Sequence, residues 1–257
     1  MIFFKKITLI GIGLIGSSIA RAVRKKKISR NISIFSRRKK TLLKAKKLNL
    51  GNSYTTNLEK SVQNSDLIII CTPISTYDSI LQKISKFVLP GAIITDVGSV
   101  KVNVVKIFSK YKNKNINFIP AHPIAGTEKS GPESGFYNLF EKRWCVLTPF
   151  GRYNKTSLNK IKGLWNKFGA RTFIMKPESH DKILALTSHM PHLISYCIVS
   201  SALNINAKDK SQVIKFSAGG FRDFTRIASS DPTMWRDIFL NKKNNLLKTL
   251  NEFNKSL

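Results

Sequence analysis

His122 is the side chain best suited to acid–base chemistry. It stands in the run His122-Pro123-Ile124-Ala125-Gly126-Thr127-Glu128, which follows the fifth expected strand of the chain. An imidazole titrates near neutral pH, so it can take a proton from an alcohol while a hydride leaves the same carbon. A histidine that only caps a turn or packs in a core is the alternative. We predict that His122 is a catalytic base.

A second group of reactive side chains lies towards the end of the chain. The run Gly219-Gly220-Phe221-Arg222-Asp223-Phe224-Thr225-Arg226 brings two guanidiniums close to one carboxylate. Arginine offers a planar fork that matches a carboxylate, so this run predicts an arginine grip on a substrate carboxylate, oriented by Asp223. An Arg–Asp pair that merely braces the domain is the alternative.

Two further imidazoles stand three residues apart in Ser188-His189-Met190-Pro191-His192. They share one face of a helix if the proline is accommodated. This spacing lacks an obvious third ligand, so we expect no metal site.

The run Gly11-Ile12-Gly13-Leu14-Ile15-Gly16 follows an expected strand and opens an expected helix. Gly11 permits a tight turn, Gly13 lets the backbone approach a pyrophosphate, and Gly16 allows close packing of helix on strand. The helix N-terminus adds positive potential. The run therefore predicts a dinucleotide cofactor rather than a merely structural glycine turn.

The end of the second expected strand bears on the choice of cofactor. Ser36-Arg37-Arg38 stands where an acidic residue normally binds the adenosine ribose. A hydroxyl followed by two guanidiniums suits a 2′-phosphate, so NADP is favoured and NAD remains possible. In a chain this rich in lysine, a basic run also arises by chance.

Two more strand ends carry polar residues, at the edge where open parallel sheets bind ligands. Cys71-Thr72-Pro73 ends the third strand, and Asp96-Val97-Gly98-Ser99-Val100-Lys101 ends the fourth. We expect the threonine and the proline to border the nicotinamide ribose. Ser99 and Lys101 are expected to face the reaction crevice, where Ser99 would also contact the cofactor. Ordinary helix caps or turns are the alternative.

Alternating strands and helices must position these motifs. Strands are expected at Ile7–Ile10, Ile32–Phe35, Leu67–Cys71, Ala92–Thr95 and Asn117–Pro120. Uninterrupted apolar strands indicate a parallel sheet covered on both faces. The fold class is therefore α/β, a Rossmann-type doubly wound, mostly parallel sheet. Two later strands, Trp144–Thr148 and Arg171–Met175, are expected to extend this sheet.

Past Pro177 the apolar spacing becomes helical. This change predicts a dinucleotide-binding domain over 1–177 and an all-α substrate and dimerisation domain over 178–257. A helical region of about 80 residues is near the size at which an isolated core becomes marginal, so it is expected to pair with a second copy or with the sheet domain.

Composition narrows the partners and the compartment. The 257 residues include 44 Lys and Arg against 14 Asp and Glu, a formal net charge of +30 that attracts any anion. The lysines are spread as compositional drift would leave them, so no nucleic-acid partner is expected. Three separated cysteines favour a reducing compartment, and the glycines of the N-terminal run disfavour a signal peptide. We expect a cytoplasmic protein without a membrane-spanning helix.

Together these motifs resemble the prephenate/arogenate (cyclohexadienyl) dehydrogenases of tyrosine biosynthesis. The likeness runs from about Lys6 to Leu240, which is nearly the whole chain. It rests on the glycine fingerprint and on Asp96–Lys101, His122–Glu128, Ser188–His192 and Gly220–Ala228. The fingerprint is common to many dehydrogenases, whereas the other four motifs, in this order, are specific.

The resemblance implies NAD(P)-dependent oxidative decarboxylation of a dicarboxylate, prephenate or arogenate. His122 would deprotonate the ring hydroxyl, Ser99 would share its hydrogen-bond network, and Arg226 would bind the ring carboxylate. Further substrate contacts would come from Thr127, Glu128, His189, His192, Arg222, Asp223 and Trp235. The tryptophan would reach the pocket of the neighbouring subunit in a domain-swapped helical homodimer.

Two other functions stay open. A hydroxyacid dehydrogenase of the same fold would keep the glycine fingerprint and place a lysine base on a long central helix. A non-catalytic NADP-sensing protein would bind the cofactor without turnover. Prephenate and arogenate differ only at a side-chain keto or amino group, so both remain candidate substrates.

Overall fold

The computed structural model describes residues 3–112 and 116–256, apart from the side chains of 207, 208, 210 and 214. Backbone contacts divide the chain into two compact units, Met1–His180 and Asp181–Leu257. The boundary expected at residue 177 falls at the first residue of helix α7 (Pro177–Leu184), and this helix contains the division.

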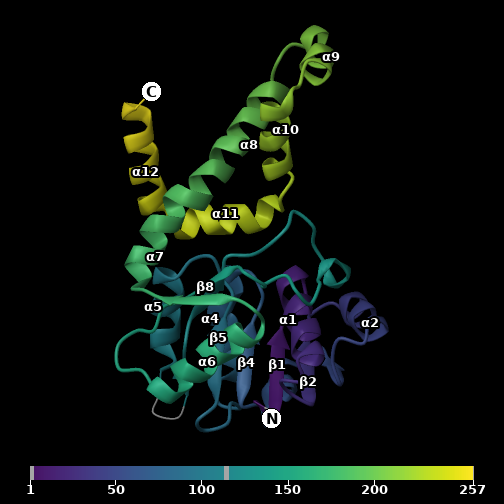
Figure 1. Ribbon diagram of the computed structural model, residues 1–257, viewed down its shortest axis with the longest axis vertical. Coiled ribbons are helices and arrows are strands. Elements are labelled where there is room, and N and C mark those ends of the chain that lie inside the picture. Colours follow the sequence, from purple (N-terminus) through teal and green to yellow (C-terminus); the bar gives the residue numbers. More distant parts are fainter. Residues whose placement is uncertain (1–2, 113–115, 257) are drawn as a thin grey trace. The chain divides into compact units, whose positions relative to one another are not determined.

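Within the described residues, a six-stranded parallel sheet forms the centre of the first unit (Figure 1). Its order, β3-β2-β1-β4-β5-β6, is that of a doubly wound dinucleotide-binding sheet. The strands are β1 (Lys6–Ile10), β2 (Asn31–Phe35), β3 (Ser53–Thr55), β4 (Leu67–Ile70), β5 (Ile93–Asp96) and β6 (Asn117–Phe118). The predicted Rossmann-type α/β fold is therefore confirmed. Of the six strands of this sheet, only the short, polar edge strand β3 was not predicted.

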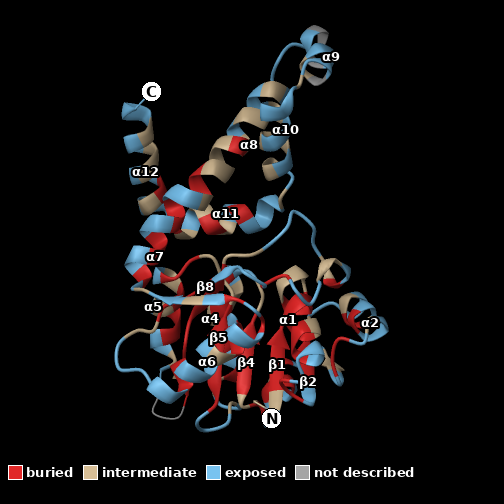
Figure 2. Cartoon of the chain, viewed as in Figure 1, coloured by how far each residue is buried: buried red, intermediate tan, exposed pale blue. Residues whose placement is uncertain are grey.

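Helices pack around this sheet. They are α1 (Leu14–Lys25), α2 (Lys39–Lys47), α3 (Leu58–Val62), α4 (Tyr77–Ile84), α5 (Val102–Lys110) and α6 (Lys155–Lys167). Every residue of β4 is buried, and the inner face of α1 supplies buried partners such as Ile19 and Val23. Figure 2 shows burial concentrated in the strands. Burial on both faces explains why these strands are continuous apolar runs in the sequence.

The two later strands do not extend the main sheet, contrary to the prediction. β8 (Trp144–Leu147) and β9 (Arg171–Ile174) join β7 (Ala121–Pro123) in a separate sheet, in which β7 is antiparallel to β8 and β8 is parallel to β9. Pro120 has no amide hydrogen, so the ladder between β5 and β6 ends there and the chain turns into β7. Thr148 donates its amide to Pro120 O at 3.0 Å and fixes this turn against the end of β8.

The second unit is helical, as predicted. After α7 it contains the π-helical segment η3 (Ala185–His189), α8 (Met190–Leu203), α9 (Ala207–Lys215), α10 (Gly219–Ala228), α11 (Pro232–Asn241) and α12 (Lys243–Lys255). Pro191 lies in the first turn of α8, directly after the π-helical segment. A proline lacks the amide hydrogen that an α-helix needs, and the wider π turn before it accommodates this loss.

Candidate active site

The glycine fingerprint forms a tight turn between β1 and α1. Gly11 has a φ of 96°, in the left-handed region that favours glycine. An added Cβ there would lie 2.8 Å from Thr72 Cγ2 and 2.9 Å from Cys71 O. At Gly16, an added Cβ would overlap Gly11 O. Gly11 is therefore required by close packing of the turn against the residues that follow β4, and Gly16 by close packing against Gly11 itself.

Gly13 has a different role, because an added Cβ would meet no described atom within 4 Å. Its backbone faces open space at the N-terminus of α1, whose first residues are Leu14 and Ile15. A helix N-terminus with accessible backbone amides attracts phosphate. The residues present therefore fit the pyrophosphate of a dinucleotide.

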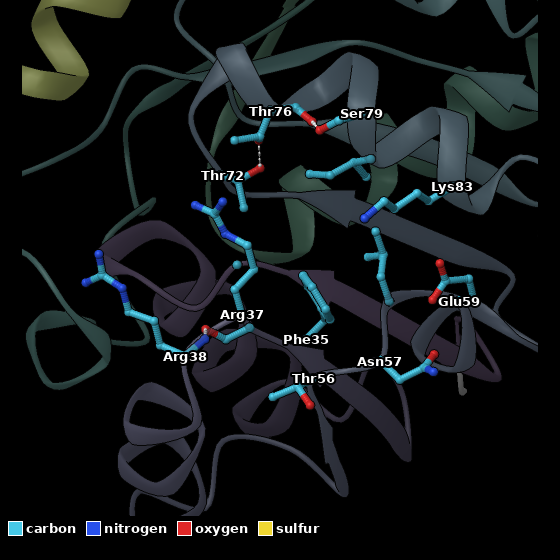
Figure 3. Close-up of a pocket in the computed structure, with 14 residues that line it drawn as sticks. Phe35, Arg37, Arg38, Thr56, Asn57, Glu59, Thr72, Thr76, Ser79 and Lys83 are labelled. Carbon is cyan, nitrogen blue, oxygen red and sulfur yellow. Dashed lines mark hydrogen bonds between the residues drawn. The ribbon is translucent and has the colours of Figure 1, made fainter.

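A cavity of about 650 Å³ opens beside this turn, at the carboxyl end of β2 (Figure 3). Its lining residues are Gly11, Phe35, Ser36, Arg37, Arg38, Thr56, Asn57, Leu58, Glu59, Thr72, Thr76, Ser79, Ile80 and Lys83. Figure 3 shows the Arg37 guanidinium turned toward Thr72 and Lys83 reaching in from α4, whereas Arg38 points away. Ser36 Oγ accepts the backbone amide of Arg38 at 3.3 Å. The cavity thus presents cations where the adenosine end of a dinucleotide would lie.

The next two strand ends differ in what they expose. Thr72, at the end of β4, places its Oγ1 2.8 Å from Thr76 Oγ1, and Pro73 beside it is exposed. Ser99 is half-buried after the end of β5. The expectation that Lys101 faces a crevice was wrong, because its side chain is 0% exposed and its Nζ lies 2.6 Å from a buried carboxylate oxygen.

His122 lies within β7 and is 8% exposed. Its Nδ1 is 2.8 Å from Nε2 of His180, a fully buried residue of α7. One nitrogen of this contact must donate and the other accept, so the tautomer of His122 is coupled to that of His180. When Nδ1 of His122 is the donor, its Nε2 keeps the lone pair that a general base needs.

Thr127 and Glu128 lie in the exposed loop after β7. Thr127 Oγ1 accepts the amide of Lys129 at 3.3 Å. Further along, Phe136 donates its amide to Ser18 Oγ of α1 at 3.1 Å. The loop is therefore anchored on the dinucleotide-binding helix, while the two predicted contact residues stay accessible.

Within the helical unit, His189, His192 and Trp235 form one aromatic cluster. His192 stacks on the indole with ring centroids 3.6 Å apart, and His189 meets it edge to face at 5.7 Å. Burial lowers the pKa of His192 below its usual value, which favours the neutral imidazole. Trp235 is 7% exposed and packs within its own chain here, so its reach into a neighbouring subunit stays a prediction.

Arg226 and Asp223 form an exposed pair on α10. Nη2 of the arginine lies 3.4 Å from Oδ1 of the aspartate, and the side chains are 64% and 73% exposed. Arg222 is exposed on the same helix. Because exposed pairs of this kind add little stability, bracing of the domain is a weak explanation. The guanidinium is accessible to a carboxylate ligand.

Both units match domains of one protein family. Residues 19–174 match the nucleotide-binding domain of prephenate dehydrogenase, and residues 176–257 match its dimerization domain. The cyclohexadienyl dehydrogenase of Zymomonas mobilis is 36% identical over 253 residues, which are 98% of this chain and 86% of that protein. The chain belongs to the prephenate dehydrogenase family. The resemblance of the sequence motifs is thereby confirmed, and the chain is an oxidoreductase.

Other members of the family agree in sequence and structure. The prephenate dehydrogenase of Bacillus subtilis is 33% identical over 96% of this chain and 67% of its own length. The structure of A. aeolicus prephenate dehydrogenase in complex with hydroxyphenyl propionate and NAD+ matches with a TM-score of 0.91 and 34% identity, over 98% of this chain and 87% of that one. Synechocystis arogenate dehydrogenase matches with a TM-score of 0.79 and 28% identity, over 98% and 88%.

Several residues of the candidate site, among them His180, Glu59 and Lys83, were not identified from the sequence. His180 is one of only four histidines in the chain, which was a usable signal. Lys83 is one of many lysines on amphipathic helices, and nothing in its local sequence sets it apart. Its position in the cavity depends on how α4 packs against α3 and α5.

Proposed function

We propose that this chain catalyses the NAD(P)-dependent oxidative decarboxylation of prephenate, arogenate or both. The observation that carries this proposal is the buried His122–His180 pair in the dinucleotide-binding unit. Ala121, which precedes His122, donates its amide to Asp96 Oδ1 at 3.1 Å, at the carboxyl end of β5. The imidazole therefore lies beside the sheet edge at which such folds bind their ligands.

The chemistry of the substrate ring requires a base at one end and a cation at the other. When bound, the nicotinamide supplies the hydride acceptor. Nε2 of His122 accepts the hydrogen bond of the ring hydroxyl and takes its proton as the C–H bond at that carbon breaks. The electron pair of the breaking bond to the ring carboxylate stays in the ring, which becomes aromatic as carbon dioxide leaves. The proton then returns to the phenolic oxygen, so His122 ends the turnover neutral.

Arg226 would bind the ring carboxylate through its exposed guanidinium. Ser99 would join the hydrogen bond to the ring hydroxyl, from its position after β5. The further substrate contacts that we propose are Thr127, Glu128, His189, His192, Arg222, Asp223 and Trp235.

A cofactor-binding protein without turnover is the competing function. The test measures reduced nicotinamide by absorbance, with prephenate and arogenate each supplied with NADP and with NAD. We expect turnover with at least one substrate. Cofactor binding with no reduced nicotinamide in all four mixtures would favour the binding protein.

We also propose that NADP is the favoured cofactor. Ser36, Arg37 and Lys83 present a hydroxyl and two cations to the cavity, which suits a 2′-phosphate. Glu59 lines the same cavity and favours NAD instead, because a carboxylate can accept the ribose hydroxyls.

Replacing Ser36 with Asp should shift the preference toward NAD. The new carboxylate repels a 2′-phosphate and accepts the ribose hydroxyls, so we expect the NADP-to-NAD ratio of kcat/KM to fall roughly tenfold or more. Ser36→Asn has the same size without the charge and is the matched control. An equal ratio in the wild type and in Ser36→Asp would rule out a 2′-phosphate at this position.

Replacing His180 with Phe should lower kcat by roughly 10- to 100-fold, because His122 can then adopt the tautomer whose Nε2 carries the proton. His180→Gln is the control, since its amide oxygen can still accept from Nδ1 of His122. Equal kcat values for the Phe and Gln variants would contradict this role.

A homodimer formed by the helical unit is the proposed assembly, since residues 176–257 match the family's dimerization domain. Exposed apolar side chains of this unit include Ile183, Leu186, Leu203, Ile205, Phe216, Met234, Leu240 and Leu247. Pro177–Leu203 is a helical segment long and apolar enough to cross a membrane by length and composition alone, a test that core helices of soluble proteins also pass. A subunit interface accounts for this apolar character without a membrane.

We further propose that the protein is cytoplasmic. Apart from its second subunit, its proposed partners are small molecules, namely the substrate and the cofactor. Cys71, Cys145 and Cys197 are free thiols, as a reducing compartment allows. The proposed substrate and NADP are both anions, and the net charge of +30 would attract them.

A further inference from the structure

A fully buried ion pair lies beside His122. Lys101 Nζ is 2.6 Å from Asp96 Oδ2, and both side chains are 0% exposed. The ammonium also donates to Ala121 O at 2.7 Å, and Asp96 Oδ1 accepts the amide of Ala121 at 3.1 Å. The two charged side chains therefore bind both backbone groups of the residue that precedes the imidazole.

The same carboxylate holds the loop that carries Ser99. Asp96 Oδ2 accepts the amide of Gly98 at 2.8 Å and the hydroxyl of Tyr77 at 3.2 Å. An added Cβ at Gly98 would lie 2.9 Å from this oxygen, so the loop is seated directly on the carboxylate. Burial, followed by the charge of Asp96, raises the pKa of Tyr77 well above its usual value, so its hydroxyl remains a donor.

Stability alone is a poor explanation for charges at this point. Moving an ammonium and a carboxylate out of water carries a large desolvation penalty, and a well-packed apolar pair of similar volume is often as stable. Charge-assisted hydrogen bonds do offer fixed distances to backbone groups. A base and a hydroxyl that share one substrate atom need such fixed distances.

We propose that Lys101 and Asp96 are positioning residues. They hold His122 and Ser99 at fixed positions relative to each other, at the reacting end of the substrate. This inference rests on the proposed dehydrogenase function. Both side chains are buried and act through the backbone, at Ala121 and in the loop before Ser99. The glycine turn between β1 and α1 lies on other elements, so loss of the pair should leave cofactor binding intact.

A double-mutant cycle tests this role. Lys101→Met and His122→Asn are made singly and together, and kcat, KM for prephenate and the dissociation constant of the cofactor are measured well below each Tm. We expect Lys101→Met to lower kcat roughly 10- to 100-fold, as a misplaced catalytic group does, with KM and cofactor affinity within about threefold of wild type. In the His122→Asn background, the same change should lower kcat by less than about threefold, because Lys101 contacts the backbone before His122, whereas Asp96 holds the loop before Ser99.

Thr8→Val is the matched control for the loss of a buried polar group that does not contact the site. Thr8 is fully buried in β1, and its Oγ1 lies 2.7 Å from Ser61 O and from Ser65 Oγ. We expect this variant to lower Tm and to keep the wild-type kcat. If Lys101→Met does not fold, the Asp96→Asn/Lys101→Met variant, which leaves no buried charge of this pair, takes its place in the cycle.

Two results would overturn the positioning role. One is a Lys101→Met variant that loses Tm and keeps kcat, as Thr8→Val should. The other is a cycle in which the kcat losses of Lys101→Met and His122→Asn multiply, since independent groups behave in this way. A wild-type chain that binds the cofactor without turnover is a different outcome, because it would reject the dehydrogenase function itself.

Discussion

Replacing His122 with Asn should lower kcat by roughly 100- to 10,000-fold, the usual contribution of general acid–base catalysis. The amide of asparagine can hydrogen bond to the ring hydroxyl and cannot take its proton. Binding of the cofactor should be unchanged, because Gly11–Gly16 and the cavity beyond β2 are unaltered. Steady-state kinetics with both substrates, together with a titration of cofactor binding, measures the two effects separately.

The pH dependence of this variant provides an internal control. Wild-type kcat should fall at acid pH, because a general base that already carries a proton cannot accept another, whereas the residual kcat of His122→Asn should lose most of that fall. The Tm must be measured as well, since His122 is 8% exposed and its ring contacts His180. A folded variant with wild-type kcat would show that the base lies elsewhere.

Replacing Arg226 with Ala should chiefly raise the KM for prephenate. Hydrogen bonds to charged groups contribute about 1.5 to 3 kcal/mol, so the loss of a guanidinium–carboxylate contact corresponds to roughly 10- to 100-fold weaker binding. The stability of the helical unit should change little, because the pair with Asp223 is exposed and 3.4 Å long. Initial rates over a range of prephenate concentrations, at saturating cofactor, give the effect on KM.

Arg236→Ala is the matched control for this prediction. Arg236 is 66% exposed in the same helical unit and lies 3.4 Å from a carboxylate oxygen of Asp237, so it matches Arg226 in its own exposure and in the length of its ion pair. We expect its removal to leave KM unchanged. Equal KM values in the wild type and in Arg226→Ala would show that the ring carboxylate is bound by another cation.

The main sheet could be predicted because its causes are local. Strands such as Leu67–Ile70 are buried on both faces, so each can be recognised in the sequence as a continuous apolar run. The second sheet could not be predicted in this way, since the residues of β8 form a strand in either sheet and only the fold pairs it with β7 rather than with the main sheet. Pro120, which separates the two sheets, was a local signal that the strand could not continue.

The candidate site could be predicted where backbone geometry or residue type is decisive. Gly11 and Gly16 are required by contacts that any side chain would violate, and their spacing shows in the sequence. Lys101 was misplaced because a buried lysine has the same local sequence as an exposed one, and only the fold brings it to Asp96. The partner of His122 was missed for a similar reason, because His180 comes from α7 at the end of the first unit.

The products of a single turnover give the most direct test of the proposed reaction. Prephenate labelled with ¹³C in the ring carboxylate is mixed with cofactor and an equal amount of the protein. Reduced nicotinamide is then measured by absorbance, and labelled carbon dioxide by mass spectrometry. We expect one carbon dioxide for each reduced nicotinamide, with both formed at the same rate and both slowed together in His122→Asn. The same measurement is made with arogenate labelled in its ring carboxylate. Reduced nicotinamide without carbon dioxide, or neither product with either substrate, would contradict the oxidative decarboxylation proposed for this chain.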